Sequence, residues 1–197
     1  MRRTAYLAMD LVNDLIHGSG PNGGGLGAEA ARRNVVANTQ AALEKARAAN
    51  ALVIFVRVGF DSAASYADCS KVSPLFSAIA NYGLLKLNSW GTELHEGLSR
   101  RDGELDIVKH RISPFYATHL EAVLRANAVE QLVLSGVSTN YVVSSAARDA
   151  HDRDYQVTIL EDCCSAESEA EHRHAIESVR SLCRSVTTVG AFNFGNQ

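Results

Sequence analysis

Short, mostly apolar runs alternate along the chain with stretches whose apolar residues repeat at helical spacing. The apolar runs predict buried β-strands at residues 5–9, 51–58, 106–109, 131–137, 156–160 and 185–189. The helical spacing predicts α-helices at residues 28–50, 74–82, 114–127, 140–152 and 167–183. Such an alternation is typical of a parallel sheet that helices cover on both faces. We therefore expect a Rossmann-like α/β fold with three layers, α/β/α, and a mostly parallel sheet, formed by residues 1–197 as a single domain.

This fold class directs attention to the ends of the strands. In open parallel sheets, ligands bind at the carboxyl ends of the strands, near the point where the strand order reverses. Four places qualify: Asp10, the loop after Val58, Lys109 and the turn at residues 136–143. Residues 18–27 hold six of the fourteen glycines and are predicted to form a loop.

Composition narrows the class of partner. The net charge is -3, which gives no electrostatic case for a nucleic acid or an anionic membrane. No apolar run is long enough to span a bilayer. The first apolar run ends at Asp10, which favours a strand over a secretory signal. We expect a cytoplasmic protein whose partner is a small-molecule substrate.

The cysteines agree with a reducing compartment. Cys163 and Cys164 are adjacent, which disfavours a disulfide between them, and no CxxC pair exists among Cys69, Cys163, Cys164 and Cys183. Free thiols are the simplest interpretation. Cys163 and Cys164 follow a predicted strand on the ligand-binding side, so a nucleophilic role is an alternative to their usual role as small buried hydrophobes.

Three motifs occur at these strand ends in a fixed order. Asp10 lies in the segment MDLVND, Lys109 is followed by the segments SPF and THL, and residues 134–143 have the sequence LSGVSTNYVV. Their order and spacing resemble the isochorismatase-like (cysteine hydrolase) superfamily. That superfamily includes nicotinamidases, carbamoylsarcosine-type and ureidoacrylate-type amidohydrolases, and the isochorismatases. The resemblance covers about residues 5–160, and Asp162 and the last helix also fit it.

The resemblance implies a catalytic triad of aspartate, lysine and cysteine. The aspartate corresponds to Asp10, the lysine to Lys109, and the nucleophile to the second residue after Asn140, which is Val142. A cysteine at a helix start is activated by unpaired N–H groups and by a nearby cation. Valine has no lone pair with which to attack and no proton to give. Covalent catalysis through residue 142 is therefore impossible in this chain.

The resemblance also implies features of the turn that precedes residue 142. The family has a cis peptide bond that does not involve proline, and it corresponds here to Val137–Ser138, which we expect to bind substrate. The family's isochorismatases also lack the cysteine and hydrolyse a vinyl ether with the strand-one aspartate as general acid. The segment Ser138-Thr139-Asn140-Tyr141 instead resembles the amidohydrolase form of the turn.

Aromatic residues are candidates for the wall of the pocket. Trp90, Phe60 and Tyr141 are predicted to contact the substrate, because pockets are rich in aromatic side chains. The alternatives are a place in the core or in a subunit interface. Nicotinamidases bind a metal through an Asp-x-His motif after the second strand, but residues 58–62 contain no histidine, and the seven histidines show no clear ligand spacing. We predict no metal and no cofactor.

Two functions of different classes remain. The first is a hydrolase of a small amide, urea or vinyl ether, with Asp10 as general acid and base and Lys109 as its partner. The second is a catalytically inactive relative, or a Cys-to-Val variant, that retains a small-molecule pocket. A pocket beside Val142, with Asp10 and Lys109 in hydrogen-bond reach of each other, would favour the first. The sequence does not identify the substrate. The resemblance implies a homo-oligomer, either a dimer or a tetramer.

Overall fold

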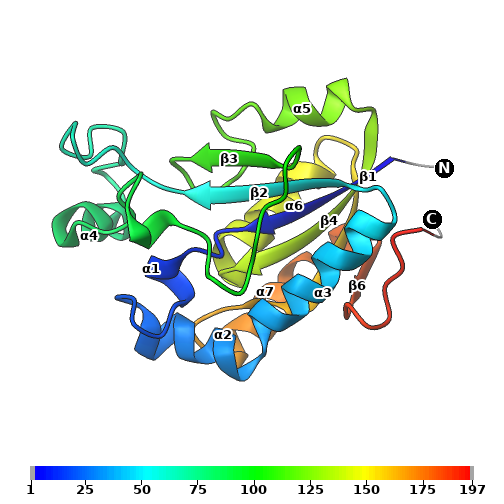
Figure 1. The fold of residues 1–197 in the computed structure, drawn as a ribbon, viewed down its shortest axis with the longest axis horizontal. Helices are drawn as coiled ribbons and strands as arrows, with labels where there is room; N and C mark the ends of the chain where they lie inside the picture. The colour runs from blue at the N-terminus through cyan, green and yellow to red at the C-terminus, as the bar shows by residue number, and fades with distance from the viewer. Residues whose placement is uncertain (1–2, 196–197) are drawn as a thin grey trace.

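A computed structural model describes residues 3–195. Its six strands form one sheet with the order β3-β2-β1-β4-β5-β6, and every pair of neighbours is parallel (Figure 1). The strands are β1 (Arg3–Met9), β2 (Leu52–Val58), β3 (Leu105–Lys109), β4 (Val129–Val137), β5 (Gln156–Ser165) and β6 (Ser185–Thr187). The prediction of a mostly parallel α/β sheet is confirmed. The strand order reverses between β1 and β4, so the ligand-binding edge is expected beside the carboxyl end of β1.

Helices cover both faces of this sheet. The α-helices are α1 (Asn13–Ile16), α2 (Ala28–Arg32), α3 (Val35–Ala48), α4 (Pro74–Tyr82), α5 (Leu120–Ala126), α6 (Ser144–His151) and α7 (Glu169–Val179). Short 3-10 helices are η2 (Trp90–Thr92) and η4 (Arg180–Leu182), and π-helical turns are η1 (Gly23–Gly27) and η3 (Thr139–Val143).

The central strand shows why the apolar runs are continuous. On one face of the sheet, Leu7 packs in a cluster with residues of α5, α6 and α7. On the other face, Tyr6 and Ala8 pack with residues of α2 and α3. Both sets of alternate side chains in β1 are therefore buried, and neither face of the strand needs polar residues.

The prediction of a single helix at residues 28–50 is wrong, because the segment forms two helices, α2 and α3. Asn34 has a left-handed backbone with φ of 54° and separates α2 from α3. Asparagine tolerates this conformation better than most residues. Arg33 precedes it and donates a hydrogen bond across to the backbone of β5. Helical periodicity continues across the break, which is why the pattern did not reveal it.

The helix predicted at residues 114–127 begins late, at Leu120. The hydroxyl of Ser113 accepts a hydrogen bond from the backbone of Phe115, and that of Thr118 accepts one from Leu120. Such local side-chain bonds stabilise turns in competition with a helix. The strand predicted at residues 156–160 is also longer, since β5 continues to Ser165.

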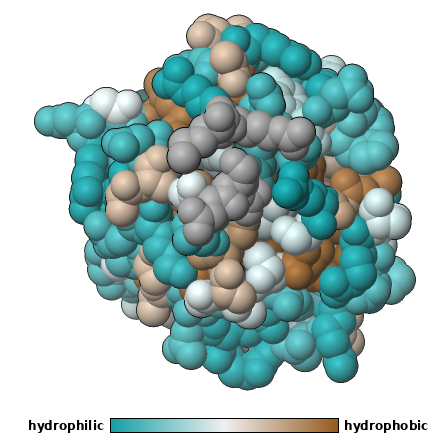
Figure 2. Space-filling model, turned by 90° about the vertical axis from the view of Figure 1, so that its right-hand side faces the viewer, coloured by the Kyte–Doolittle hydropathy of each residue, from teal (hydrophilic) through white to brown (hydrophobic). Residues whose placement is uncertain are grey.

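The end of the molecule at which the strands begin lies opposite the predicted ligand-binding edge. Figure 2 shows this end, where hydrophilic residues predominate and hydrophobic residues form small separate areas. Among the helices of residues 3–195, none combines the length and the apolar composition that a membrane crossing would need.

Candidate active site

Asp10 and Lys109 meet at the carboxyl end of the sheet although they come from strands that are not neighbours. Asp10 directly follows β1, and its backbone N–H donates to the carbonyl of Val56 in β2. Lys109 ends β3 and pairs with Val58 of β2. The Lys109 Nζ lies 2.8 Å from Asp10 Oδ2, and the two side chains are 2% and 5% exposed. The lysine therefore reaches across the end of β2 to form a buried ion pair.

The environment of this pair acts on the carboxyl group in two opposing ways. Burial raises the pKa of Asp10, while the charge and hydrogen bond of Lys109 and the backbone N–H of Val58 lower it, and the net result is a raised pKa. The Lys109 ammonium also donates to the carbonyl of Arg111 at 3.0 Å. The second carboxylate oxygen, Asp10 Oδ1, is buried and has no hydrogen-bond partner within residues 3–195. A buried acceptor without a partner is costly and is a common mark of a functional site.

The turn after β4 carries Val142, the residue that the resemblance assigns to the position of the nucleophile. Gly136 has φ of 133°, and a Cβ at this residue would collide with the Met9 carbonyl of β1. Only glycine combines this backbone with so close an approach. One residue further along, the peptide bond Val137–Ser138 is cis, as the resemblance implied. Val142 follows within η3, is buried, and packs into the core beneath α6.

A cavity of about 310 Å³ opens above these residues. It is lined by the following predicted site residues: Asp10, Lys109, Val137, Ser138, Tyr141 and Val142. Part of its wall is mainly apolar and includes Leu75, Phe76, Ile79 and Tyr82 of α4. A small cavity with an apolar wall and a few convergent polar groups is the usual form of a small-molecule site.

Two predicted pocket residues lie elsewhere, since neither Phe60 nor Trp90 is among the residues that line the cavity. Phe60 is fully buried behind the wall, with its ring 5.8 Å from that of Phe76. Trp90 is half-exposed and packs edge-on against His17 at 5.0 Å. An aromatic residue in a loop after a strand does not reveal which way its ring turns, because the path of the loop decides it.

Sequence reasoning did not single out three charged residues that line the cavity, Asp14, Arg111 and Glu167. Asp14 accepts a hydrogen bond from the backbone of Leu85 at 2.7 Å and thereby joins α1 to the segment after α4. Arg111 donates to the carbonyls of Asp68 and His110. For Asp14 and Arg111, the available signal was their position in the same short segments as Asp10 and Lys109.

A cluster of possible metal ligands lies outside this cavity, although the sequence showed no clear ligand spacing. His17, His95 and Glu96 each place a ligating atom within 4.8 Å of the others. The backbone N–H groups of Ser19 and Gly97 donate to the Nδ1 atoms of the two histidines. These bonds place the proton of each neutral ring on Nε2, where a metal would need a lone pair. The present arrangement therefore favours the hydrogen bond between His17 and Glu96 over a metal.

The cysteines offer no nucleophile to this cavity, since none of the four lines it. Cys163 and Cys164 are fully buried. Burial raises the pKa of the Cys163 thiol and raises that of Cys164 to about 12. Thiols in such surroundings are protonated and unreactive near neutral pH.

Comparison with known proteins is consistent with this geometry. The model of the isochorismatase domain matches residues 4–191. The chain belongs to the isochorismatase family.

Three similar proteins illustrate the range of the family. An uncharacterized isochorismatase family protein, YecD of Escherichia coli O157:H7, is 36% identical over 135 residues, which are 68% of this chain and 69% of that protein. The ureidoacrylate amidohydrolase RutB of Methylobacterium radiotolerans is 37% identical over 114 residues, 57% of this chain and 44% of RutB, so the match spans less than half of that relative. The crystal structure of an isochorismatase family protein from Desulfovibrio vulgaris superposes with a TM-score of 0.85 at 26% identity, covering 97% of this chain and 96% of the other.

Proposed function

We propose that this member of the isochorismatase family hydrolyses a small amide, urea or vinyl ether without a thiol nucleophile. Asp10 is the general acid and base, and Lys109 is the partner that holds it. One observation carries the proposal: the buried ion pair leaves Asp10 Oδ1 without a hydrogen-bond partner, and Asp10 lines the cavity beside Val142. An oxygen in this situation is suited to exchange a proton with a bound molecule.

For an amide or a urea, water takes the place of the absent thiol. The ionised Asp10 removes a proton from the water while the water oxygen bonds to the carbonyl carbon of the substrate, which gives a tetrahedral intermediate. Asp10 then returns this proton to the leaving nitrogen while the C–N bond breaks, releasing an acid and an amine. Lys109 stays protonated throughout and keeps the carboxylate in place.

For a vinyl ether, the same carboxyl group begins in its protonated form, which its raised pKa favours. It delivers the proton to the terminal vinyl carbon and leaves an oxocarbenium ion. Water adds to that ion and gives a proton back to Asp10. The resulting hemiketal breaks into a carbonyl compound and an alcohol.

The apolar wall and the comparisons support a small substrate with an apolar part. Leu75, Phe76, Ile79 and Tyr82 of α4 line the same cavity as the polar pair. One relative is named as a ureidoacrylate amidohydrolase, which supports an amide-like or urea-like substrate. The alternative is an inactive relative that retains a binding pocket, and the hydrocarbon side chain of Val142 favours it.

The experiment that separates these functions assays a panel of amides, ureas and vinyl ethers. The proteins are the native chain, Asp10→Asn and Val142→Cys. Hydrolysis by the native chain that disappears in Asp10→Asn supports the proposal. Hydrolysis by Val142→Cys alone would show that the thiol chemistry was lost with the cysteine, and the inactive relative would then be the correct assignment.

A further inference from the structure

A histidine that does not touch the cavity makes a direct contact with the site's turn. His172 lies in α7 and is only 2% exposed. Its Nδ1 is 2.8 Å from the hydroxyl of Thr139, and its Nε2 is 2.9 Å from the guanidinium of Arg33. The residues that it joins are more than a hundred positions apart in sequence, so local structure does not explain the contact.

The chemistry of the two partners determines where the imidazole carries its proton. A guanidinium has only N–H donors, so Nε2 of His172 must accept the bond from Arg33. In a neutral imidazole the other nitrogen then carries the hydrogen. Nδ1–H therefore donates to the oxygen of Thr139, and the direction of both bonds is determined by Arg33.

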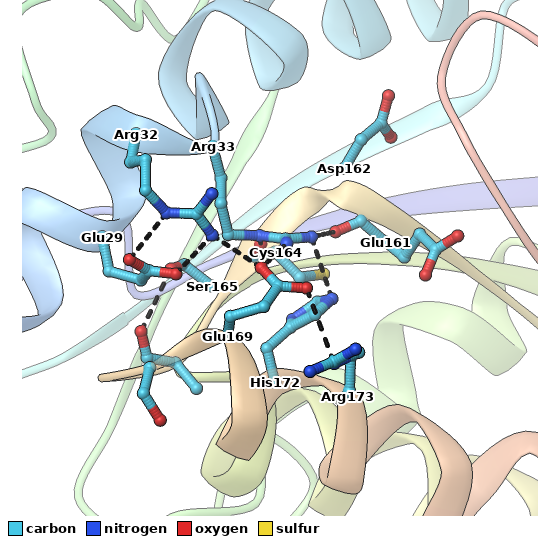
Figure 3. Close-up of polar contacts among 12 residues, drawn as sticks. Glu29, Arg32, Arg33, Glu161, Asp162, Cys164, Ser165, Glu169, His172 and Arg173 are labelled. Atoms are coloured by element: carbon cyan, nitrogen blue, oxygen red, sulfur yellow. Dashed lines mark hydrogen bonds and ion pairs between the residues drawn. The ribbon is translucent and has the colours of Figure 1, made fainter.

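Arg33 is itself held in one position, as Figure 3 shows. Its guanidinium donates to the backbone carbonyls of Cys164 and Glu161 and to the carboxylate of Glu169. With His172, these partners place acceptors on all three of its nitrogens. A donor fixed this firmly disfavours the two alternative states of the histidine, which are a flipped ring and the other tautomer.

The other end of this chain of contacts is the turn of the candidate site. Thr139 is buried, follows Ser138 directly, and is the first residue of η3. That turn ends at Val143 and carries Tyr141 and Val142 to the cavity.

We propose that His172 is a positioning residue: through the Nδ1–H tautomer that Arg33 imposes, it holds Thr139 and so sets the position of the turn that lines the cavity. The catalytic consequence rests on the proposed hydrolase function. The tautomer and the position of the turn do not, and both can be measured without a substrate.

The charge state of the histidine agrees with this role. Burial, and then the charge of Arg33, lower the pKa of His172 to about 4, while the carboxylates of Glu169 and Glu29 oppose this shift. The ring is therefore neutral at physiological pH, as a ring that accepts a bond from a guanidinium must be.

Two amide substitutions separate the two contacts. In His172→Asn, the side-chain amide lies near the former Nδ1 and can still donate to Thr139. In His172→Gln, the amide reaches the former Nε2 and can accept from Arg33, but it leaves Thr139 without its donor. His174→Gln is the matched control, because His174 is exposed and lies two residues along the same helix.

The first measurement is the tautomer, by long-range ¹H–¹⁵N correlation spectra of the histidine rings in the native chain. We expect His172 to carry its proton on Nδ1 and Arg33→Met to lose this preference. A proton on Nε2 in the native chain would overturn the proposal.

The second measurement uses a thiol at the turn as a reporter of position. In the Val142→Cys background, the pH profile of alkylation by iodoacetamide is compared with and without each substitution. Misplacing a reactive group by about 1 Å costs up to about a hundredfold in rate. We expect His172→Gln and Thr139→Val to change the alkylation rate about tenfold, which lies within that range. We expect His172→Asn to restore most of the rate and His174→Gln to have none of these effects.

Should a substrate be found, we expect His172→Gln to lower kcat with little change in KM. Equal alkylation profiles for His172→Gln, Thr139→Val and the control, in folded proteins, would overturn the proposal. If His172→Gln fails to fold, Thr139→Val decides, because it removes the same hydrogen bond at nearly constant shape. If the panel shows no hydrolysis, the proposed function fails while the tautomer and alkylation results still decide this inference.

Discussion

Two polar clusters at this edge of the molecule differ in how completely their hydrogen bonds are satisfied. The Asp10–Lys109 pair leaves one carboxylate oxygen without a partner, and both residues line a cavity. In the Arg33 cluster, formed with Glu169, His172 and Thr139, every guanidinium nitrogen and both ring nitrogens of the histidine have partners. None of these four residues lines the cavity.

The difference teaches which cluster is suited to chemistry and which to support. A satisfied network gains nothing from a ligand and stabilises one conformation. An unsatisfied acceptor beside a cavity gains a hydrogen bond when a molecule binds. The presence of an ion pair alone would not separate the two clusters, since both contain one.

The largest effect is expected from removing the charge of Asp10, whose Oδ1 is the acceptor without a partner. Asp10→Asn keeps the shape of the side chain but cannot exchange the proton, and activity on any substrate found in the panel should fall by roughly a thousandfold. The control is Asp152→Asn, which alters an exposed carboxylate. Equal loss of activity in both variants, or retained activity in Asp10→Asn, would mean that the Asp10–Lys109 pair does no acid–base chemistry.

The next effect concerns stability and distinguishes the clusters by pH. Removing one partner of a buried ion pair costs about 3–5 kcal/mol, so Lys109→Met should lower the free energy of unfolding by an amount of that order. Arg33→Met should lower it by less, because the side chain of its partner Glu169 is 43% exposed. In Lys109→Met the buried Asp10 loses the group that lowers its pKa.

Lys109→Met should therefore be least stable above the raised pKa of Asp10. Its stability should recover as pH falls and the Asp10 carboxylate becomes neutral. Arg33→Met leaves the Asp10–Lys109 pair in place and removes a cation that lowers the pKa values of His172 and Glu169, so its pH dependence reflects those two groups. Denaturant unfolding at several pH values measures the difference. The same pH dependence in both variants would remove this distinction between the clusters.

A smaller effect on stability tests how the backbone of the turn after β4 packs against β1. Gly136→Ala places a Cβ against the Met9 carbonyl at a residue with φ of 133°. Strained backbone of this kind costs on the order of 1–3 kcal/mol, and the midpoint of thermal unfolding should fall accordingly. Gly24→Ala is the control, since a Cβ there meets no atom within 4 Å. A stable Gly136→Ala would mean that the turn after β4 can move away from β1.

The smallest effect is the loss of folding stability in acid that is due to His172 of the Arg33 cluster. The pKa of His172 is about 4 in the folded state, against 6.5 as its ordinary value. The unfolded chain therefore binds a proton that the folded chain does not, and stability is lost as pH falls from about 6.5 towards 4. This part of the acid sensitivity should be absent in His172→Asn and present in His174→Gln. Parallel pH profiles of stability in both variants would contradict it.

The sequence by itself determined the fold class and most of the strands, since burial on both faces of a parallel sheet requires continuous apolar runs. It also determined the motifs of Asp10, Lys109 and the turn at residues 136–143, because each is a short segment attached to one strand end. Helix boundaries were less accessible, as at Asn34, where one left-handed residue interrupts a helical pattern that otherwise continues.

Only the tertiary structure decided which side chains meet. It brought Asp10 and Lys109 to 2.8 Å across β2, left Phe60 and Trp90 away from the lining of the cavity, and joined Arg33 to His172. Hydrophobic patterns report burial along each element, whereas contacts between elements depend on the strand order and on loop paths. Those are set by the packing of the whole chain, and no local pattern of residues records them.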